Sequence, residues 1–373
     1  MRATELAVVG AGPAGVSCAL EAASRGVRVT LVDRGDCAGG QLVKQTHKFF
    51  GWHEKSAGTR GILIAKQLER QVASDRNITF LRGTEALGYY GDGVLLVETP
   101  EGIDRLCCKR LMVATGASER MLLFPGNDLP GVYGAGAVQT LMNVHGVRPG
   151  DSVLMIGSGN IGLIVSYQLA QAGVRVAAVV EALPTIGGYA VHASKIRRLG
   201  IPILTRHTIK EAYGEEKVEG AVIWELDDRW NGIPGTDRDL GVDVVCLATG
   251  LTPLAEILWQ AGVEMSYVPE LGGFVPVYDE NMETTAKGVF VAGDVAGIEE
   301  ASTAMAAGRL AGLCAAASLG KVPEDEFGRV HEAISRELGE LRAGPTSEKI
   351  LKGLSQMNAA RGVKPGLGKE AGA

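Results

Sequence analysis

The order of apolar and polar residues predicts short strands alternating with longer helices, and one arrangement of these elements occurs twice. In each copy an apolar run of strand length is followed by a helix-like stretch and then by a second apolar run. The ranges are 5–9, 16–25 and 27–32 in the first copy, and 152–156, 163–171 and 174–180 in the second. Each copy therefore predicts a strand–helix–strand unit with parallel strands.

The spacing G-x-G-x-x-G joins the first strand to the helix in both copies, as Gly10-Ala11-Gly12-Pro13-Ala14-Gly15 and Gly157-Ser158-Gly159-Asn160-Ile161-Gly162. Such glycines let the backbone approach a pyrophosphate, whose oxygens face the first amides of the helix. A carboxylate follows the second strand, Asp33 at 18 residues after Gly15 and Glu181 at 19 residues after Gly162. An isolated motif can be a glycine-rich turn of another fold, but the complete context favours two dinucleotide sites.

Length and charge narrow the class of protein. The 373 residues are enough for two or three domains, and the net charge of −6 argues against a nucleic-acid partner. We see no apolar run long enough to span a membrane, and the N-terminus enters a strand without a signal peptide. We therefore expect a cytoplasmic protein.

The cysteines show no catalytic or metal-binding spacing. The six are Cys18, Cys37, Cys107, Cys108, Cys246 and Cys314, and none forms a C-x-x-C or C-x-x-x-x-C pair. Cys107 and Cys108 are neighbours in a strand-like stretch and point to opposite faces, which disfavours a disulfide between them. The six histidines are scattered as well, so we predict no metal site.

Three further motifs accompany the two glycine turns. Ala114-Thr115-Gly116 and Ala248-Thr249-Gly250 each follow an apolar strand, and residues 288–294, ending in Gly293-Asp294, precede an Ala-rich helix. From about residue 4 to about residue 320, the chain resembles flavoproteins with two dinucleotide-binding domains, the thioredoxin reductase-like group. The resemblance implies an α/β fold with two Rossmann-like domains: an FAD-binding domain at 1–118 plus 252–320, an NAD-binding domain inserted at 119–251, and a C-terminal helical extension with a disordered end at 321–373.

The resemblance also implies which residues bind the cofactors. Asp294 would accept a hydrogen bond from the ribityl chain of FAD, Gln41 would contact the flavin, and the helix beginning near Glu300 would aim its amides at the N1/O2 edge. The Arg-Gln pair that usually opens this helix is replaced by Glu300-Ala301. The FAD positions are Gly10, Gly12, Pro13, Ala14, Gly15, Asp33, Arg34, Gly40, Gln41, Ala114, Thr115, Gly116, Gly293, Asp294 and Ala301. The NAD positions are Gly157, Gly159, Asn160, Ile161, Gly162, Glu181, Ala248, Thr249 and Gly250.

The segment before the second glycine turn departs from the thioredoxin reductases. Those enzymes carry their redox cysteines there, whereas residues 129–140 of this chain contain no sulfur, which excludes disulfide reduction by that route. Leu129-Pro130-Gly131-Val132 and the following Gly-Ala-Val-Gln-Thr instead resemble the alpha subunits of sarcosine oxidase, opine oxidase, proline dehydrogenase and hydrogen cyanide synthase. Several of those relatives carry a C-terminal iron–sulfur domain, but here no cysteine follows Cys314.

The resemblance implies hydride transfer between NAD(H) and FAD in the electron-transfer subunit of an amine- or amino-acid-oxidising complex. Candidate partners are a small iron–sulfur protein and a second flavoprotein subunit, and the assembly can be a homo- or hetero-oligomer. A stand-alone NADH-dependent reductase of a quinone or small acceptor is an alternative. A non-catalytic subunit that only binds nucleotides is another.

Two details concern the nucleotide and the flavin. Glu181 accepts from a ribose 2′-hydroxyl and repels a 2′-phosphate, and no arginine follows it in Ala182-Leu183-Pro184, so NAD(H) is favoured over NADP. Arg197 and Arg198 could still reach the adenosine. The loop after the first strand–helix–strand unit carries basic and aromatic side chains that either lie near the flavin or form an ordinary surface loop: Lys44, His47, Lys48, Phe49, Phe50, Trp52, His53 and Lys55.

Beyond residue 320 the pattern becomes helical. Apolar residues at three- and four-residue steps form one stripe at Phe327, Val330, Ile334, Leu338 and Leu341, and a shorter one at Ile350, Leu351, Leu354 and Met357. Gly344-Pro345 separates the two helices, and residues 358–373 form a Gly-, Lys- and Ala-rich end that we expect to be disordered. The stripes can pack on the chain itself or dock a partner subunit.

Overall fold

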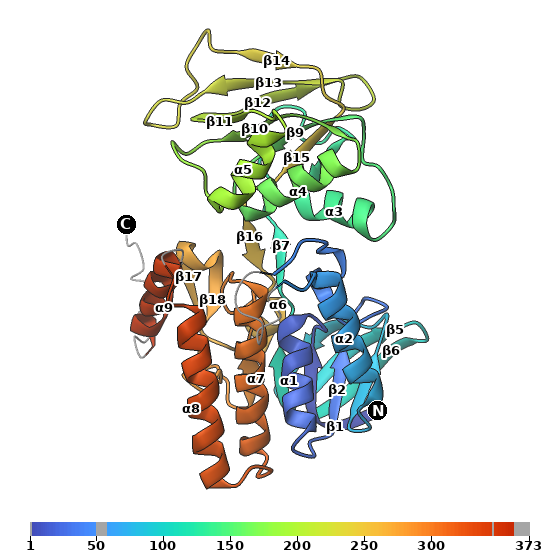
Figure 1. The fold of residues 1–373 in the computed structure, drawn as a ribbon. Helices are drawn as coiled ribbons and strands as arrows, with labels where there is room; N and C mark the ends of the chain where they lie inside the picture. The colour runs from blue at the N-terminus through green and yellow to red at the C-terminus, as the bar shows by residue number, and fades with distance from the viewer. Residues whose placement is uncertain (1, 50–57, 345–346, 362–373) are drawn as a thin grey trace, which may run out of the picture. The chain divides into compact units, whose positions relative to one another are not determined.

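A computed structural model describes residues 2–49, 58–344 and 347–361 (Figure 1). The chain forms two compact units: the first comprises Met1–Val43, Phe49–Ser118 and Thr252–Ala373, and the second comprises Lys44–Lys48 and Glu119–Leu251. Each contains a sheet with parallel strands and helices packed against it. The predicted α/β fold, with one Rossmann-like unit inserted between the segments of another, is confirmed.

A seven-stranded sheet forms the centre of the first unit. Its strands are β1 (Arg2–Val9), β2 (Val29–Val32), β3 (Ile78–Leu81), β4 (Glu85–Tyr89), β5 (Val94–Thr99), β6 (Gly102–Val113) and β19 (Val289–Val291). The order is β3-β2-β1-β6-β5-β4, and β19 pairs in parallel with the last residues of β6. Because β3, β2, β1, β6 and β19 are parallel, their carboxyl ends lie at one edge of the sheet.

Helices α1 (Pro13–Ala23), α2 (Gly61–Ser74) and α7 (Ala301–Ser318) accompany this sheet. α1 and α7 lie side by side, although they come from opposite ends of the sequence (Figure 1). A side chain at Gly308 of α7 would overlap the backbone of Ala14. This glycine therefore allows the close approach of the two helices.

The C-terminal helices α8 (Glu324–Leu341) and α9 (Glu348–Ala360) pack on the first unit, through Ile334, Leu338 and Met357. Leu351 of the shorter predicted stripe is 47% exposed and takes no part in this core. Residues 358–360, which we expected to be disordered, belong to α9, and residues 362–373 lie outside the described residues. The remaining short elements of the unit are η1 (Gly40–Lys44), α6 (Glu256–Gln260), β17 (Met265–Val268), η3 (Pro269–Leu271) and β18 (Gly273–Pro276).

The second unit has a five-stranded parallel sheet and a three-stranded antiparallel sheet. The first, in the order β11-β10-β9-β15-β8, contains β8 (Val132–Gly134), β9 (Ser152–Ile156), β10 (Arg175–Glu181), β11 (Ile203–Thr205) and β15 (Val244–Leu247). The second contains β12 (His207–Tyr213), β13 (Gly220–Glu225) and β14 (Arg238–Leu240). Its helices are α3 (Ala135–Asn143), α4 (Asn160–Gln171) and α5 (Ala190–Arg198), and the pair β7 (Ala117–Glu119) and β16 (Leu251–Pro253) stands where the chain passes from one unit to the other.

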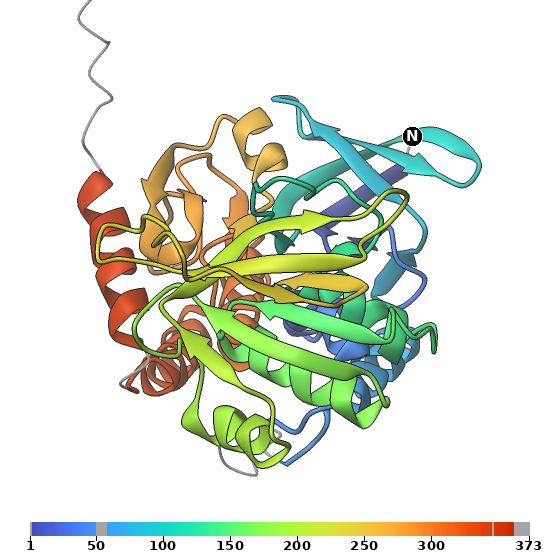
Figure 2. The same cartoon turned by 90° about the horizontal axis from the view of Figure 1, so that it is seen from above.

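Alternating residues of β9 give this second unit two apolar layers, because successive side chains of a strand point to opposite faces. Val153 and Met155 pack with the helices, whereas Leu154 and Ile156 pack with the three-stranded sheet. Figure 1 shows the antiparallel sheet, the parallel sheet and the helices of this unit in that order, and Figure 2 looks onto the same layers from above.

Both helices that follow the glycine turns begin three residues earlier than their apolar pattern predicts. α1 begins at Pro13 rather than at 16, and α4 begins at Asn160 rather than at 163. The reason is that the middle glycine of each turn, Gly12 or Gly159, is the N-cap, so the motif itself forms the first helical turn. Among the described residues, no helix has both the length and the apolar character needed to cross a membrane.

Candidate functional site

The first glycine turn leaves β1 at the carboxyl edge of the sheet. Gly10 has a φ of +103°, a conformation that favours glycine, and its amide donates to the carbonyl of Val32 at 2.8 Å. A side chain at Gly10 would overlap the carbonyl of Ala114, and one at Gly15 would overlap the carbonyl of Gly10. The first and third glycines are therefore required by the packing of the protein itself.

Gly12 differs from these two glycines. A Cβ atom placed on Gly12 would meet no atom of the described residues within 4 Å. Gly12 is the N-cap of α1 and has no side chain that could cap the first amides, and Pro13 follows it at the start of the helix. An open helix N-terminus of this kind suits the pyrophosphate of a dinucleotide, because the amides and the helix dipole favour an anion there.

Asp33 lies beside this turn. Its carboxylate accepts hydrogen bonds from the amides of Ala11 at 2.6 Å and Gly35 at 2.7 Å. Arg34, also predicted to bind FAD, is exposed. The carboxylate is thus fixed next to the open end of α1, where a ribose hydroxyl could donate to it.

The segment Gly39-Gly40 folds back over the same turn. The amide of Gly39 donates to the carbonyl of Ala11 at 2.7 Å, and a Cβ on Gly40 would lie 2.7 Å from the Cα of Gly12. Gln41, the predicted flavin contact, is exposed, while Leu42 is buried. The structure therefore brings Gly40 and Gln41 next to the open helix end.

The second glycine turn repeats these hydrogen bonds one for one. Gly157 N donates to Val180 O as Gly10 N does to Val32 O, and Ala248 N donates to Ile156 O as Ala114 N does to Val9 O. Ser158 N donates to the Glu181 carboxylate as Ala11 N does to that of Asp33. Gly188 N donates to Ser158 O as Gly39 N does to Ala11 O. A Cβ on Gly159 would again meet nothing within 4 Å, whereas one on Gly162 would overlap Gly157. Asn160 and Ile161 form the first turn of α4. The two units thus offer the same kind of opening.

Two contributors to the second turn were missed by sequence reasoning. The hydroxyl of Ser158 donates to Glu181 at 2.7 Å, and Glu181 also accepts from the amide of Leu183 at 3.0 Å. Gly188, like Gly39, folds back on its turn, and a Cβ there would lie 2.9 Å from the amide nitrogen of Asn160. The doubled glycine Gly187-Gly188 stands at nearly the same distance from its fingerprint as Gly39-Gly40, so the signal was present in the sequence.

The two Ala-Thr-Gly motifs pack against the two glycine turns. The Cβ atoms of Ala114 and Ala248 lie next to the third glycine of each fingerprint. Thr115 donates to the carbonyl of Leu254 at 2.6 Å, and Thr249 donates to the carbonyl of Arg120 at 2.6 Å. Each hydroxyl therefore connects the end of a strand to another segment of the same unit. Gly116 and Gly250 follow the threonines and have positive φ. Their role in cofactor binding stays a prediction.

Gly293 and Asp294 follow β19 at the same edge of the first sheet. A Cβ on Gly293 would lie 2.9 Å from the Cβ of Ala14, so the loop lies against the start of α1. Burial raises the pKa of Asp294 to about 6, and the charge of Glu299 acts in the same direction against the hydrogen bond from the Glu299 amide. α7 then begins at Ala301. Three of the predicted FAD segments of the first unit, at residues 10–15, 33–41 and 293–301, are thereby brought together at one sheet edge, and the fourth, at 114–116, follows the end of β6 at the same edge.

The basic loop residues lie in the second unit. Lys44 donates from Nζ to the carbonyl of Gly136 at 2.9 Å and to Oγ1 of Thr140 at 3.3 Å, and burial lowers its pKa. Burial, with the charges of His192 and Lys195, lowers the pKa of His47 to about 4, so this ring is neutral at physiological pH. Their predicted role near the flavin, and that of the exposed Lys48, stays a prediction.

The rest of that loop can be placed only in part. Phe49 belongs to the first unit and packs against its core. Phe50, Trp52, His53 and Lys55 lie outside the described residues.

A carboxylate that sequence reasoning missed caps α3, the cysteine-free helix that begins within residues 129–140. Glu119 accepts from the amides of Gly136 at 2.5 Å and Ala137 at 3.1 Å. All six cysteines are free thiols, and burial raises the pKa of Cys108 to about 12. Glu119 thus satisfies the first amides of α3, whereas in the described part of the chain no side chain caps α1 or α4.

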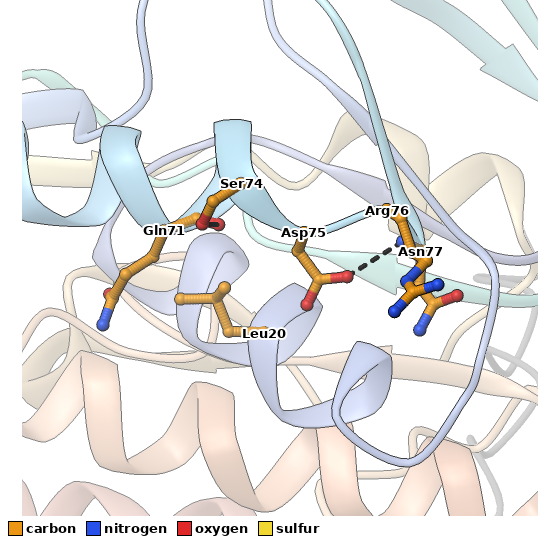
Figure 3. Close-up of a pocket in the computed structure, with 6 residues that line it drawn as sticks. All are labelled: Leu20, Gln71, Ser74, Asp75, Arg76 and Asn77. Atoms are coloured by element: carbon orange, nitrogen blue, oxygen red, sulfur yellow. Dashed lines mark hydrogen bonds between the residues drawn. The ribbon is translucent and has the colours of Figure 1, made fainter.

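An open hollow of about 450 Å³ lies elsewhere on the first unit (Figure 3). It is lined by Leu20, Gln71, Ser74, Asp75, Arg76 and Asn77, between the end of α2 and the start of β3. Ligands of parallel α/β sheets bind at the carboxyl ends of the strands, whereas this hollow stands at an amino end. We therefore do not assign a cofactor to it.

Comparison with known proteins agrees with this geometry. The chain is 28% identical over 330 residues to one subunit of the opine oxidase of Agrobacterium tumefaciens (strain Ach5), covering 84% of this chain and 66% of that protein. It is 30% identical over 317 residues to the alpha subunit of the sarcosine oxidase of Rhizobium meliloti (strain 1021), covering 81% of this chain and 29% of that one. The chain thus spans about two thirds of the first relative and less than a third of the second.

The fold is similar to that of the thioredoxin reductase of T. acidophilum, with a TM-score of 0.71 and 23% identity, over 86% of this chain and 99% of that one. Residues 4–308 match the family described as pyridine nucleotide-disulphide oxidoreductase. The predicted resemblance is confirmed, and the two open glycine turns fit the FAD and NAD(P) that the family implies. The chain therefore belongs to the pyridine nucleotide-disulphide oxidoreductase family and is an FAD-dependent oxidoreductase.

Proposed function

We propose that this protein transfers hydride between NAD(H) and FAD, with FAD at the first glycine turn and NAD(H) at the second. The observation that carries the proposal is the matched pair of openings over Gly12 and Gly159, each at an uncapped helix N-terminus and each beside a fixed carboxylate. A protein that binds a single nucleotide would need only one of these two openings.

The residues of this chain would act mainly by positioning. A bound flavin and nicotinamide supply the hydride donor and acceptor, and general acid–base catalysis is not needed for that step. Gly12 and Gly159 give the pyrophosphates access to backbone amides, and Asp33 and Glu181 accept from ribose hydroxyls. Asp294 would accept from the ribityl chain, which orients the flavin relative to α7.

NAD(H) is the nucleotide that the second turn suits best. Glu181 accepts from Ser158 and Leu183, which holds its carboxylate at the turn. A 2′-phosphate placed there would meet a fixed negative charge, whereas a 2′-hydroxyl could donate to it. We therefore propose NAD(H) rather than NADP(H).

The electrons would leave the flavin for an acceptor outside this chain. Helix α3 contains no cysteine and so offers no disulfide, and its first amides are already bonded to Glu119. Both relatives described above are named as subunits, one of an opine oxidase and one of a sarcosine oxidase. These facts support an electron-transfer subunit of an amine- or amino-acid dehydrogenase-type complex, with a second flavoprotein or a small iron–sulfur protein as partner.

Anaerobic mixing of the FAD-loaded chain with NADH tests the proposal. We expect rapid bleaching of the flavin absorption band with NADH and much slower bleaching with NADPH. A band that persists while NADH binds would contradict hydride transfer and favour a subunit that only holds nucleotides. Steady turnover with a quinone and no added protein would instead favour the stand-alone reductase.

A further inference from the structure

The C-terminal extension reaches the loop that carries Asp294. Arg342, which follows the last turn of α8, donates from Nε to Oε2 of Glu299 at 2.9 Å and from Nη2 to Oε1 at 2.5 Å. Such a two-bond pairing of guanidinium and carboxylate fixes the geometry of both groups. Glu299 stands two residues before the start of α7.

This ion pair is enclosed by protein. The side chains of Arg342 and Glu299 are 16% and 12% exposed. Burial works to lower the pKa of Arg342, but the hydrogen bonds and charge of Glu299 raise it, so the guanidinium stays charged. Burial raises the pKa of Tyr278 to about 12, and this neutral phenol also hydrogen-bonds to Arg342. Loss of either charge would leave the other buried without its partner, which is costly.

The pair is directly connected to Asp294. The amide of Glu299 donates to Oδ1 of Asp294 at 3.5 Å, and the amide of Gly297 donates to the Asp294 carbonyl at 3.3 Å. Residues 294–299 thus form a tight loop whose far end is held by Arg342. A cavity of about 10 Å³, close to the room one water needs, is lined by Gly293, Glu299, Thr303 and Arg342 among others.

We propose that Arg342 is a positioning residue for the FAD site, because it holds Glu299 and thereby the loop that presents Asp294 and the start of α7. This rests on the proposed placement of FAD in the first unit. Without Arg342, the charge of Glu299 would face Asp294 uncompensated, and the two carboxylates would repel one another across the loop. The C-terminal extension would then belong to the cofactor site, although its sequence carries no cofactor motif.

The experiment compares FAD binding by full-length Arg342→Gln, Arg342→Lys and the double variant Arg342→Gln/Glu299→Gln. Arg336→Gln is the matched control, because Arg336 lies on the same helix in an exposed pair with Glu332. The dissociation constant of FAD is measured by flavin fluorescence between pH 5 and pH 8. Thermal unfolding of the first unit without FAD reports whether each variant is folded there, and NADH binding reports on the second unit.

We expect Arg342→Gln to bind FAD about tenfold or more weakly than the wild type, and Arg342→Lys to lie between them. The double variant should recover most of the loss, since two amides can pair without a net charge. Glu299 is the charged group that acts on Asp294 directly, and Arg342 and Tyr278 line the same small cavity as Glu299. Because an uncompensated Glu299 raises the pKa of Asp294, the pH at which FAD binding weakens should move upward by about one unit in Arg342→Gln.

Two outcomes would overturn the proposed role of Arg342 and leave the proposed function standing. One is an Arg342→Gln variant that binds FAD with the affinity and pH profile of Arg336→Gln. The other is a double variant as weak as Arg342→Gln, which would show that neutralising Glu299 is not what matters. If the wild type binds no FAD at the first unit, so that Gly12→Ala leaves FAD binding unchanged, the proposed function fails together with this inference.

Discussion

The three glycines of each fingerprint are under different constraints. Gly10 and Gly15 are crowded by backbone atoms of the protein itself, whereas a side chain at Gly12 would point into open space. Gly12 also has a φ of −74°, which alanine adopts easily. An alanine at Gly12 would therefore conflict only with a ligand, while an alanine at Gly15 would conflict with the fold.

This difference separates binding from stability. We expect Gly12→Ala to keep the unfolding temperature of the apoprotein and to weaken FAD binding by about tenfold or more, because the methyl group blocks the pyrophosphate. Gly15→Ala should destabilise the apoprotein by about 2–3 kcal/mol or more through overlap with Gly10. Thermal unfolding and FAD titration measure both quantities. Equal FAD affinity in Gly12→Ala and the wild type would place the pyrophosphate elsewhere.

Glu181 is the residue on which nucleotide choice depends in our proposal. Glu181→Gln keeps an oxygen that can accept from Ser158 and removes the negative charge. We expect the dissociation constant of NADH to change little and that of NADPH to fall about tenfold, because repulsion of the 2′-phosphate is relieved. Competitive titration with both nucleotides measures the ratio. A ratio identical to that of the wild type would mean that Glu181 does not face the ribose.

At the scale of elements, the helices α1, α3 and α4 differ in what meets their first amides. α1 and α4 begin at glycines with open space beside them, whereas the start of α3 is closed by Glu119. We expect Glu119→Ala to destabilise the second unit by about 1–2 kcal/mol, since the amides of Gly136 and Ala137 lose their acceptor. Glu119→Gln, which retains an acceptor, should lose less. Urea unfolding measures the effect, and equal stability of both variants and the wild type would contradict it.

The local elements of both turns were predictable because each strand, glycine turn and helix lies within about thirty residues and leaves a periodic pattern. Contacts between distant segments leave no such pattern. Lys44 and Gly136 are 92 positions apart, and Glu299 and Arg342 are 43 apart. Sequence reasoning therefore placed Asp33 and Glu181 at their glycine turns, where the structure has them, but missed Glu119 and Arg342, whose partners are known only once the chain has folded.

At the scale of the whole molecule, the chain has separate cores. One core contains β1, α1 and α7 together with α8 and α9, and the cores on the two faces of β9 belong to the second unit. Because a ligand stabilises only the folded unit that binds it, FAD and NADH should each act on a different unfolding transition. The proposed placement of the two cofactors can therefore be tested without any measurement of activity.

Scanning calorimetry of the full chain provides this test. A nucleotide present at about 100 times its dissociation constant stabilises its unit by about 2.7 kcal/mol. We expect FAD to raise the transition of the first unit and NADH that of the second. At the same nucleotide concentration, Gly12→Ala should reduce only the shift caused by FAD, to about half or less, and Gly159→Ala only the shift caused by NADH, since neither alanine meets atoms of the described residues. A shift by FAD that survives Gly12→Ala but disappears in Gly159→Ala would reverse the assignment of the cofactors, and with it the roles of Asp33 and Glu181.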